Sequence, residues 1–100
     1  MLKYKIVERK DISYPGVRRM VFRVVMEAVK LPSEEQLKKI AIDLWVNGNT
    51  VWDEFTVFIY LPNMDTNNIA YGVGEFNQKG LKELIINQDA LMITKLKGDI

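Results

Sequence analysis

Two stretches near the N-terminus alternate between apolar and polar side chains, as half-buried β-strands do. The alternation is partial over Leu2–Arg9. Over Val17–Met26 one face is apolar (Met20, Phe22, Val24, Met26) and the other mixes arginine with valine (Arg19, Val21, Arg23, Val25). Pro15 and Gly16 mark a turn between the two stretches. Because the two predicted strands are close in sequence, we expect them to pair as an antiparallel hairpin.

Residues 33–47 show the pattern of an amphipathic helix. Ser33 and Gln36 have the spacing of a capping box, in which each side chain accepts a hydrogen bond from the other residue's backbone amide. Apolar residues then recur at helical spacing and form one stripe: Leu37, Ile40, Ala41, Leu44 and Trp45. Asn47 and Gly48 are typical of a helix C-terminus, so we expect the helix to end there.

Two further strands are predicted after the helix. Glu54–Leu61 is apolar or aromatic on both faces, which is typical of a central strand. Asn68–Phe76 is the next strand, and it carries Gly72 and Gly74 on one face. Glycine weakens a strand, so we expect the helix to approach closely at these two positions.

The C-terminal segment begins with a turn at residues 78–80. Residues 81–86 then fit a fifth strand, whereas residues 88–97 fit a short helix or another strand equally well. The periodicity leaves both alternatives open for this last segment.

These elements predict an α+β fold in a single domain spanning residues 1–100. We expect a mostly antiparallel four- to five-stranded sheet in the order β-β-α-β-β plus a C-terminal element, with one amphipathic helix (about 33–47) packed on one face. We call the opposite side of the sheet the far face. One helix cannot cover both sides, so the far face is solvated, or the C-terminal segment or a partner covers it.

The composition excludes several kinds of chemistry. The chain has no cysteine and no histidine, which rules out disulfides, thiolate catalysis and the commonest general base and metal ligand. Its serines, Ser13 and Ser33, have no histidine partner. A loop starting at Asp65 lacks the glycine and glutamate of a calcium-binding loop. We therefore assign no catalytic, metal or cofactor-binding residue and expect no cofactor.

Carboxylates alone leave one enzymatic alternative. Acidic residues stand near the ends of the predicted elements: Asp43, Asp53, Glu54, Asp65 and Glu75. Two carboxylates held close together can do acid–base work, so a small carboxylate-dependent enzyme stays as an alternative.

The ends and the charge of the chain bear on location and partners. The N-terminus lacks the apolar core of a signal peptide, and no apolar run is long enough to span a membrane, so we expect a cytoplasmic protein without membrane contact. The net charge is +1, but residues 1–50 carry +4 and residues 51–100 carry −3. Such a division allows a charge-complementary contact, although a mixed surface also simply maintains solubility.

Basic and aromatic side chains are predicted to meet on the far face. If Tyr4 and Phe22 face the helix, the neighbouring cations of both N-terminal strands face away from it. The residues that form the candidate interaction surface are Arg19, Arg23, Phe58, Tyr60 and Tyr71. Cations beside aromatic rings can bind single-stranded nucleic acid, which is one alternative. In the other, the aromatic residues form a second small core under residues 81–97.

Three segments of the chain carry a resemblance. They are YKIVERKDIS with VRRMVFRVV (4–13 and 17–25), PSEEQLKKIA (32–41) and FTVFIYLPNMDTNNIAYGVGEF (55–76). Together they resemble a family of small uncharacterised bacterial α+β domains with no assigned activity. The chain departs from the family pattern at Asn63, where a glycine is expected. The resemblance implies the order of the elements and no catalytic residue.

The favoured hypothesis is a non-enzymatic protein-interaction or accessory module that associates with itself or with another protein. The predicted far face offers more apolar surface than a small monomer usually exposes: Val21, Val25, Phe58, Tyr60, Ile69, Tyr71 and Val73. The segment 81–96, a second copy or another protein could cover it. A twofold homodimer is the commonest closed assembly.

Overall fold

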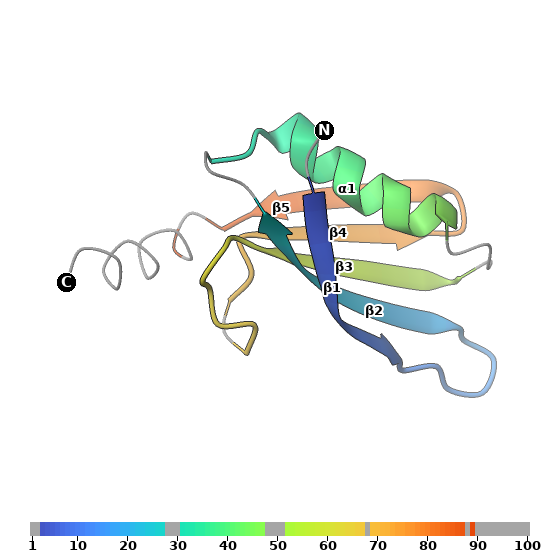
Figure 1. The fold of residues 1–100 in the computed structure, drawn as a ribbon. Coiled ribbons are helices and arrows are strands. Elements are labelled where there is room, and N and C mark those ends of the chain that lie inside the picture. The colour runs from blue at the N-terminus through green and yellow to red at the C-terminus, as the bar shows by residue number, and fades with distance from the viewer. Residues whose placement is uncertain (1–2, 28–30, 48–51, 68, 88, 90–100) are drawn as a thin grey trace.

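A computed structural model describes residues 3–27, 31–47, 52–67, 69–87 and 89. Figure 1 shows one helix lying against one side of a single sheet. The elements are β1 (Lys3–Asp11), β2 (Arg19–Glu27), α1 (Glu34–Asn47), β3 (Glu54–Tyr60), β4 (Gly72–Asn77) and β5 (Gly80–Ile86). The predicted fifth strand over residues 81–86 is thereby confirmed, whereas the segment 88–97 lies outside the described residues apart from Asp89.

The strands lie side by side in chain order, β1-β2-β3-β4-β5. The pairs β1–β2, β3–β4 and β4–β5 are antiparallel, so the predicted N-terminal hairpin is confirmed. The pair β2–β3 is parallel, because α1 returns the chain to the end of the sheet where β2 began. The five-stranded sheet is therefore mostly antiparallel, as predicted, but mixed, with one parallel pair beside its centre.

The capping box of α1 forms as its sequence predicts. The Ser33 backbone amide donates to Oε1 of Gln36 over 2.9 Å, and the Gln36 amide donates to Oγ of Ser33 over 3.2 Å. Leu37, Ile40, Ala41 and Leu44 are buried, and Trp45 is half-buried with its ring stacked on Phe76 at 5.5 Å between centroids. The predicted apolar stripe is therefore the side of the helix that packs on the sheet.

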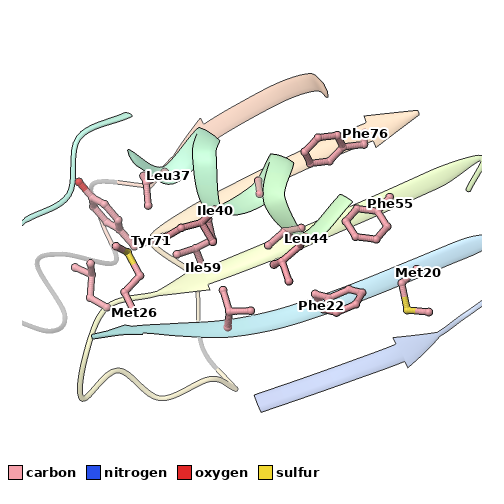
Figure 2. Packing of buried hydrophobic residues seen from close by; sticks show 14 residues of the cluster. Met20, Phe22, Met26, Leu37, Ile40, Leu44, Phe55, Ile59, Tyr71 and Phe76 are labelled. Atoms are coloured by element: carbon pink, nitrogen blue, oxygen red, sulfur yellow. The ribbon is translucent and has the colours of Figure 1, made fainter. Parts of the chain in front are cut away.

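The core lies between α1 and the sheet (Figure 2). Its strand residues alternate along β2, β3 and β4, with Met20, Phe22, Val24, Met26, Phe55, Val57, Ile59 and Phe76 buried. A Cβ atom at Gly74 would lie 3.1 Å from Cβ of Ala41, and one at Gly72 would lie 3.4 Å from Cδ1 of Leu37. The predicted close approach of the helix to these two glycines is therefore confirmed.

The predicted fourth strand was placed too early. The chain forms a loop before β4, and pairing begins at Gly72 rather than at Asn68. Asn87 binds this loop, because its side-chain amide donates to the Ala70 carbonyl over 3.0 Å and its backbone amide donates to the Tyr71 carbonyl over 2.8 Å. Tyr71 precedes the first residue of β4, so the alternation of that strand does not extend to it.

Two local features shape the ends of the sheet. The β1–β2 register shifts at Val7, between Ile6 and Glu8, and the bulge bends β1 so that its N-terminal half turns toward α1 (Figure 1). Burial, and then the negative charge of Asp43 on α1, raise the pKa of Tyr4. Asn63 has a φ of 68°, in the left-handed region that asparagine tolerates better than most residues.

Candidate functional site

The far face carries an apolar stripe that crosses four strands. The stripe is formed by Val21 and Val25 of β2, Phe58 of β3, Val73 of β4 and Ile85 of β5. The first four are half-buried and Ile85 is 38% exposed, because neighbouring strands cover only the flanks of these side chains. Among the described elements, the single helix packs on the opposite side of the sheet. The stripe is therefore a surface of the described domain.

Arg23 is held in place within this stripe, between Val21 and Val25 on β2 and opposite Phe58 on β3. Its guanidinium forms an ion pair with Glu8 of β1 and lies over the Phe58 ring, 5.0 Å from the centroid. Burial alone would lower the pKa of Arg23, but a hydrogen bond and charge interaction with Tyr60, together with those from Glu8, outweigh it and raise that pKa. Arg23 is thus a fixed cation whose charge is already matched by a carboxylate.

Arg19 is also paired. Its Nε lies 2.7 Å from Oε2 of Glu54 on the neighbouring strand β3, and its guanidinium carbon lies 5.9 Å from the centroid of the Tyr14 ring. About half of the Glu54 side chain stays exposed, with a relative exposure of 57%. Arg19 therefore contributes a surface ion pair near the β1–β2 turn.

The strand ends beside Arg19 are joined through Asp53. Oδ2 of Asp53 accepts a hydrogen bond from the Arg18 backbone amide over 2.8 Å, and Oδ1 accepts from the side-chain amide of Gln78 in the β4–β5 turn. These bonds, first that from Arg18 and then that from Gln78, lower the pKa of Asp53. Asp53 thus ties β2 to the start of β3 and to the β4–β5 turn.

The five predicted surface residues divide into three groups. Arg19, Arg23 and Phe58 lie together on the far face, as predicted. Tyr60 adjoins Arg23 there, but its side chain is only 2% exposed. Tyr71 is 3% exposed and belongs to the core, where its ring lies near Met26 and Ile59 (Figure 2). The prediction that Tyr71 lies on the far face is therefore wrong.

Carboxylates gather on the side of the far face away from the arginines. Glu75 of β4 and Glu83 of β5 stand directly opposite each other, because the β4–β5 register shifts after Glu75. In an unbroken hairpin register, Glu75 would stand opposite Lys82. Among the described residues the ion pairs are Arg19–Glu54 and Arg23–Glu8, so neither glutamate takes part in one.

The opposite edge of the far face carries two lysines and Glu8, whose charge is paired with Arg23. Lys10 of β1 stands across from Val21, and Lys5 stands across from Val25, so both lie on the far-face side of their strand. Lys10 and Glu83 are far-face residues that the sequence reasoning missed. Both positions depend on register shifts. The alternation that places Tyr4 on the helix side would place Lys10 there too, and the shift at Val7 turns Lys10 to the far face, as the shift after Glu75 does for Glu83.

The described part of the chain contains no group of three or more acidic residues placed to hold a metal ion. None of its helices has the length and apolar character needed to cross a membrane. No family model, curated protein or solved structure matches the chain. The resemblance to small bacterial α+β domains therefore stays a prediction.

Proposed function

We propose that this domain is a non-enzymatic protein-interaction module and that the far face of the sheet is its working surface. The observation that supports it is the apolar stripe, which crosses β2 to β5 on the side of the sheet that α1 leaves open. Contiguous apolar surface with a polar rim is typical of protein interaction sites. The rim here is charged, with Lys10 at one edge and Glu83 at the other.

Single-stranded nucleic-acid binding has weaker support. Arg19 and Arg23, the two arginines among the four predicted cations, already pair with carboxylates, whereas Lys3 and Lys5 take part in neither pair. Tyr71, a predicted stacking platform, is buried in the core. A nucleic-acid strand would have to displace two ion pairs and would find Phe58 already covered on one side by Arg23.

Photo-crosslinking tests the proposed surface. Phe58 is replaced by a photoreactive phenylalanine analogue in the full chain, in the cells that produce the protein. Ile42 is the matched control position, since it is 39% exposed on α1, away from the sheet. We expect protein adducts at position 58 that are missing at position 42.

A second substitution makes the crosslinking test specific. Val73 stands next to Phe58 on β4, so Val73→Glu places a charge in the apolar stripe and should remove the adduct at position 58. No adduct at position 58, or the same adducts at both positions, contradicts the proposed function. Cytoplasmic location stays a prediction, and the same cells allow it to be checked by fractionation.

A further inference from the structure

The far face places two like charges opposite each other, and this arrangement bears on which partner covers it. Like charges directly across a strand pair are unfavourable in an isolated subunit. Glu75 and Glu83 are such a pair, and neither has an ion-pair partner among the described residues. A cation supplied from outside the subunit would relieve their repulsion. This inference rests on the proposed function, because it names the partner of that same surface.

The strand registers place a cation at the same level of the sheet. One row across the far face runs Lys10, Val21, Thr56, Glu75 and Glu83 from β1 to β5. The next row runs Glu8, Arg23, Phe58, Val73 and Ile85. The first row therefore has a cation at one edge, carboxylates at the other and Thr56 on the central strand.

Two aligned face-to-face arrangements of two copies are available to such a sheet. A twofold axis parallel to the strands keeps each row at its own level and lays β1 of one copy over β5 of the other. Lys10 then faces Glu83 of the second copy, and Phe58 faces its own equivalent. A twofold axis across the strands instead lays β1 over β1, so that like-charged edges meet, which is unfavourable.

We propose that a second copy of this chain covers the far face, related by a twofold axis that runs along β3. The Lys10 edge of each copy lies over the Glu75–Glu83 edge of the other, and the Phe58 side chains meet near the axis. The charge complementarity of the two edges selects this occupant and this orientation. Because the axis repeats every contact, each copy both gives and receives the Lys10 contact.

The area of the face indicates the size class of the interface. Five strands spaced about 4.8 Å apart, and about six residues of each, make a face of roughly 24 Å by 20 Å. Two such faces bury on the order of 1,000 Å², which is the lower limit for a specific interface. We therefore expect a dimer that forms in the micromolar range and that loses affinity as salt screens the two charged edges.

A charge exchange tests the orientation. Sedimentation equilibrium of the full chain from about 1 to about 100 µM compares the wild type with Lys10→Glu, Glu83→Lys and the double variant. Each single variant should weaken the dimer at least about tenfold, and the double variant should restore it to within about threefold. Lys39→Glu, on the exposed side of α1, is the matched control and should leave association unchanged.

Thermal unfolding of each variant separates weaker association from loss of fold. Glu83→Lys removes the repulsion with Glu75 in the single subunit, so at a protein concentration low enough to keep the wild type monomeric its melting temperature should not fall. A wild-type protein that is monomeric over the whole range, or a double variant that binds no better than the weaker single variant, overturns the inference. If position 58 crosslinks to a different protein, the proposed function stands and the second-copy inference falls. If it crosslinks to nothing, both fall.

Discussion

The closest contact between helix and sheet gives the sharpest prediction about stability. Gly74→Ala adds a methyl group whose carbon would lie 3.1 Å from Cβ of Ala41. Carbon atoms pack at about 3.5–4.0 Å, so the helix or β4 has to move by several tenths of an ångström. Ala41 has no side-chain torsion that could turn its methyl group away. The added group therefore strains the packing of α1.

The size of the effect follows from two opposing contributions. Overpacking a core typically costs about 1–3 kcal/mol, whereas replacing glycine by alanine stabilises by about 0.4–1 kcal/mol through the unfolded chain. We expect Gly74→Ala to lower the free energy of unfolding by about 0.5–2 kcal/mol. Gly72→Ala is the matched control, because its Cβ would lie 3.4 Å from Cδ1 of Leu37, a methyl group that can shift. It should be neutral or stabilise by up to about 1 kcal/mol.

Urea unfolding of five proteins measures the predicted strain. They are the wild type, Gly74→Ala, the control Gly72→Ala, Ala41→Gly and the double variant of Gly74→Ala with Ala41→Gly. Ala41→Gly alone costs about 1 kcal/mol of helix stability, but it removes the methyl group that Gly74→Ala would strike. The double variant should therefore be more stable than the sum of the two single effects predicts, by about 0.5 kcal/mol or more. Additive effects, or a Gly72→Ala variant less stable than Gly74→Ala, would refute the reasoning.

Four further predictions concern the cap, the helix stripe, the Asp53 bonds and nucleic-acid binding. Ser33→Ala should cost about 1 kcal/mol in urea unfolding, because one capping hydrogen bond is lost. Trp45→Ala should lower the free energy of unfolding by about 2–3 kcal/mol, less than the loss of a fully buried aromatic residue would. Its neighbour Val46 is 56% exposed, so Val46→Ala should change the free energy of unfolding by less than about 0.5 kcal/mol. The pKa of Asp53 is lowered from its ordinary value of 3.8, so its carboxylate stabilises the fold above pH 3.8 and this stabilisation is lost as pH falls through the folded pKa. Asp53→Asn should therefore unfold with a weaker pH dependence than the wild type below pH 3.8. Fluorescence anisotropy at about 50 mM salt should show no binding of a mixed-sequence single strand; binding that weakens with salt and disappears in Arg23→Ala would favour the nucleic-acid alternative.

Local patterns predicted the parts of the fold that depend on local chemistry. The capping box, the apolar stripe and the strand alternation of β2 and β3 are each encoded within a few residues, so these elements formed where they were expected. Gly72 and Gly74 predicted the close approach of the helix, because glycine weakens a strand and needs such a reason to occur inside one.

Other features depend on contacts between distant residues. Tyr71 has the spacing of a far-face residue, but it precedes the first residue of β4 and its ring enters the core. The position of Glu83 opposite Glu75 depends on a one-residue shift that the turn residues do not reveal. The parallel pairing of β2 and β3 also depends on where the helix returns the chain, which periodicity does not encode.

A short crosslink across the proposed axis tests most directly whether the far face is the surface of association. The chain has no cysteine, so Thr56→Cys introduces a single reactive thiol. Thr56 lies on the far face of the central strand β3, along which the proposed axis runs. Ile42→Cys, on the outer side of α1, is the matched control. With a short bismaleimide at micromolar protein concentration, the account predicts a covalent dimer for Thr56→Cys and almost none for Ile42→Cys. Equal yields at the two positions, or no dimer at position 56, would contradict it.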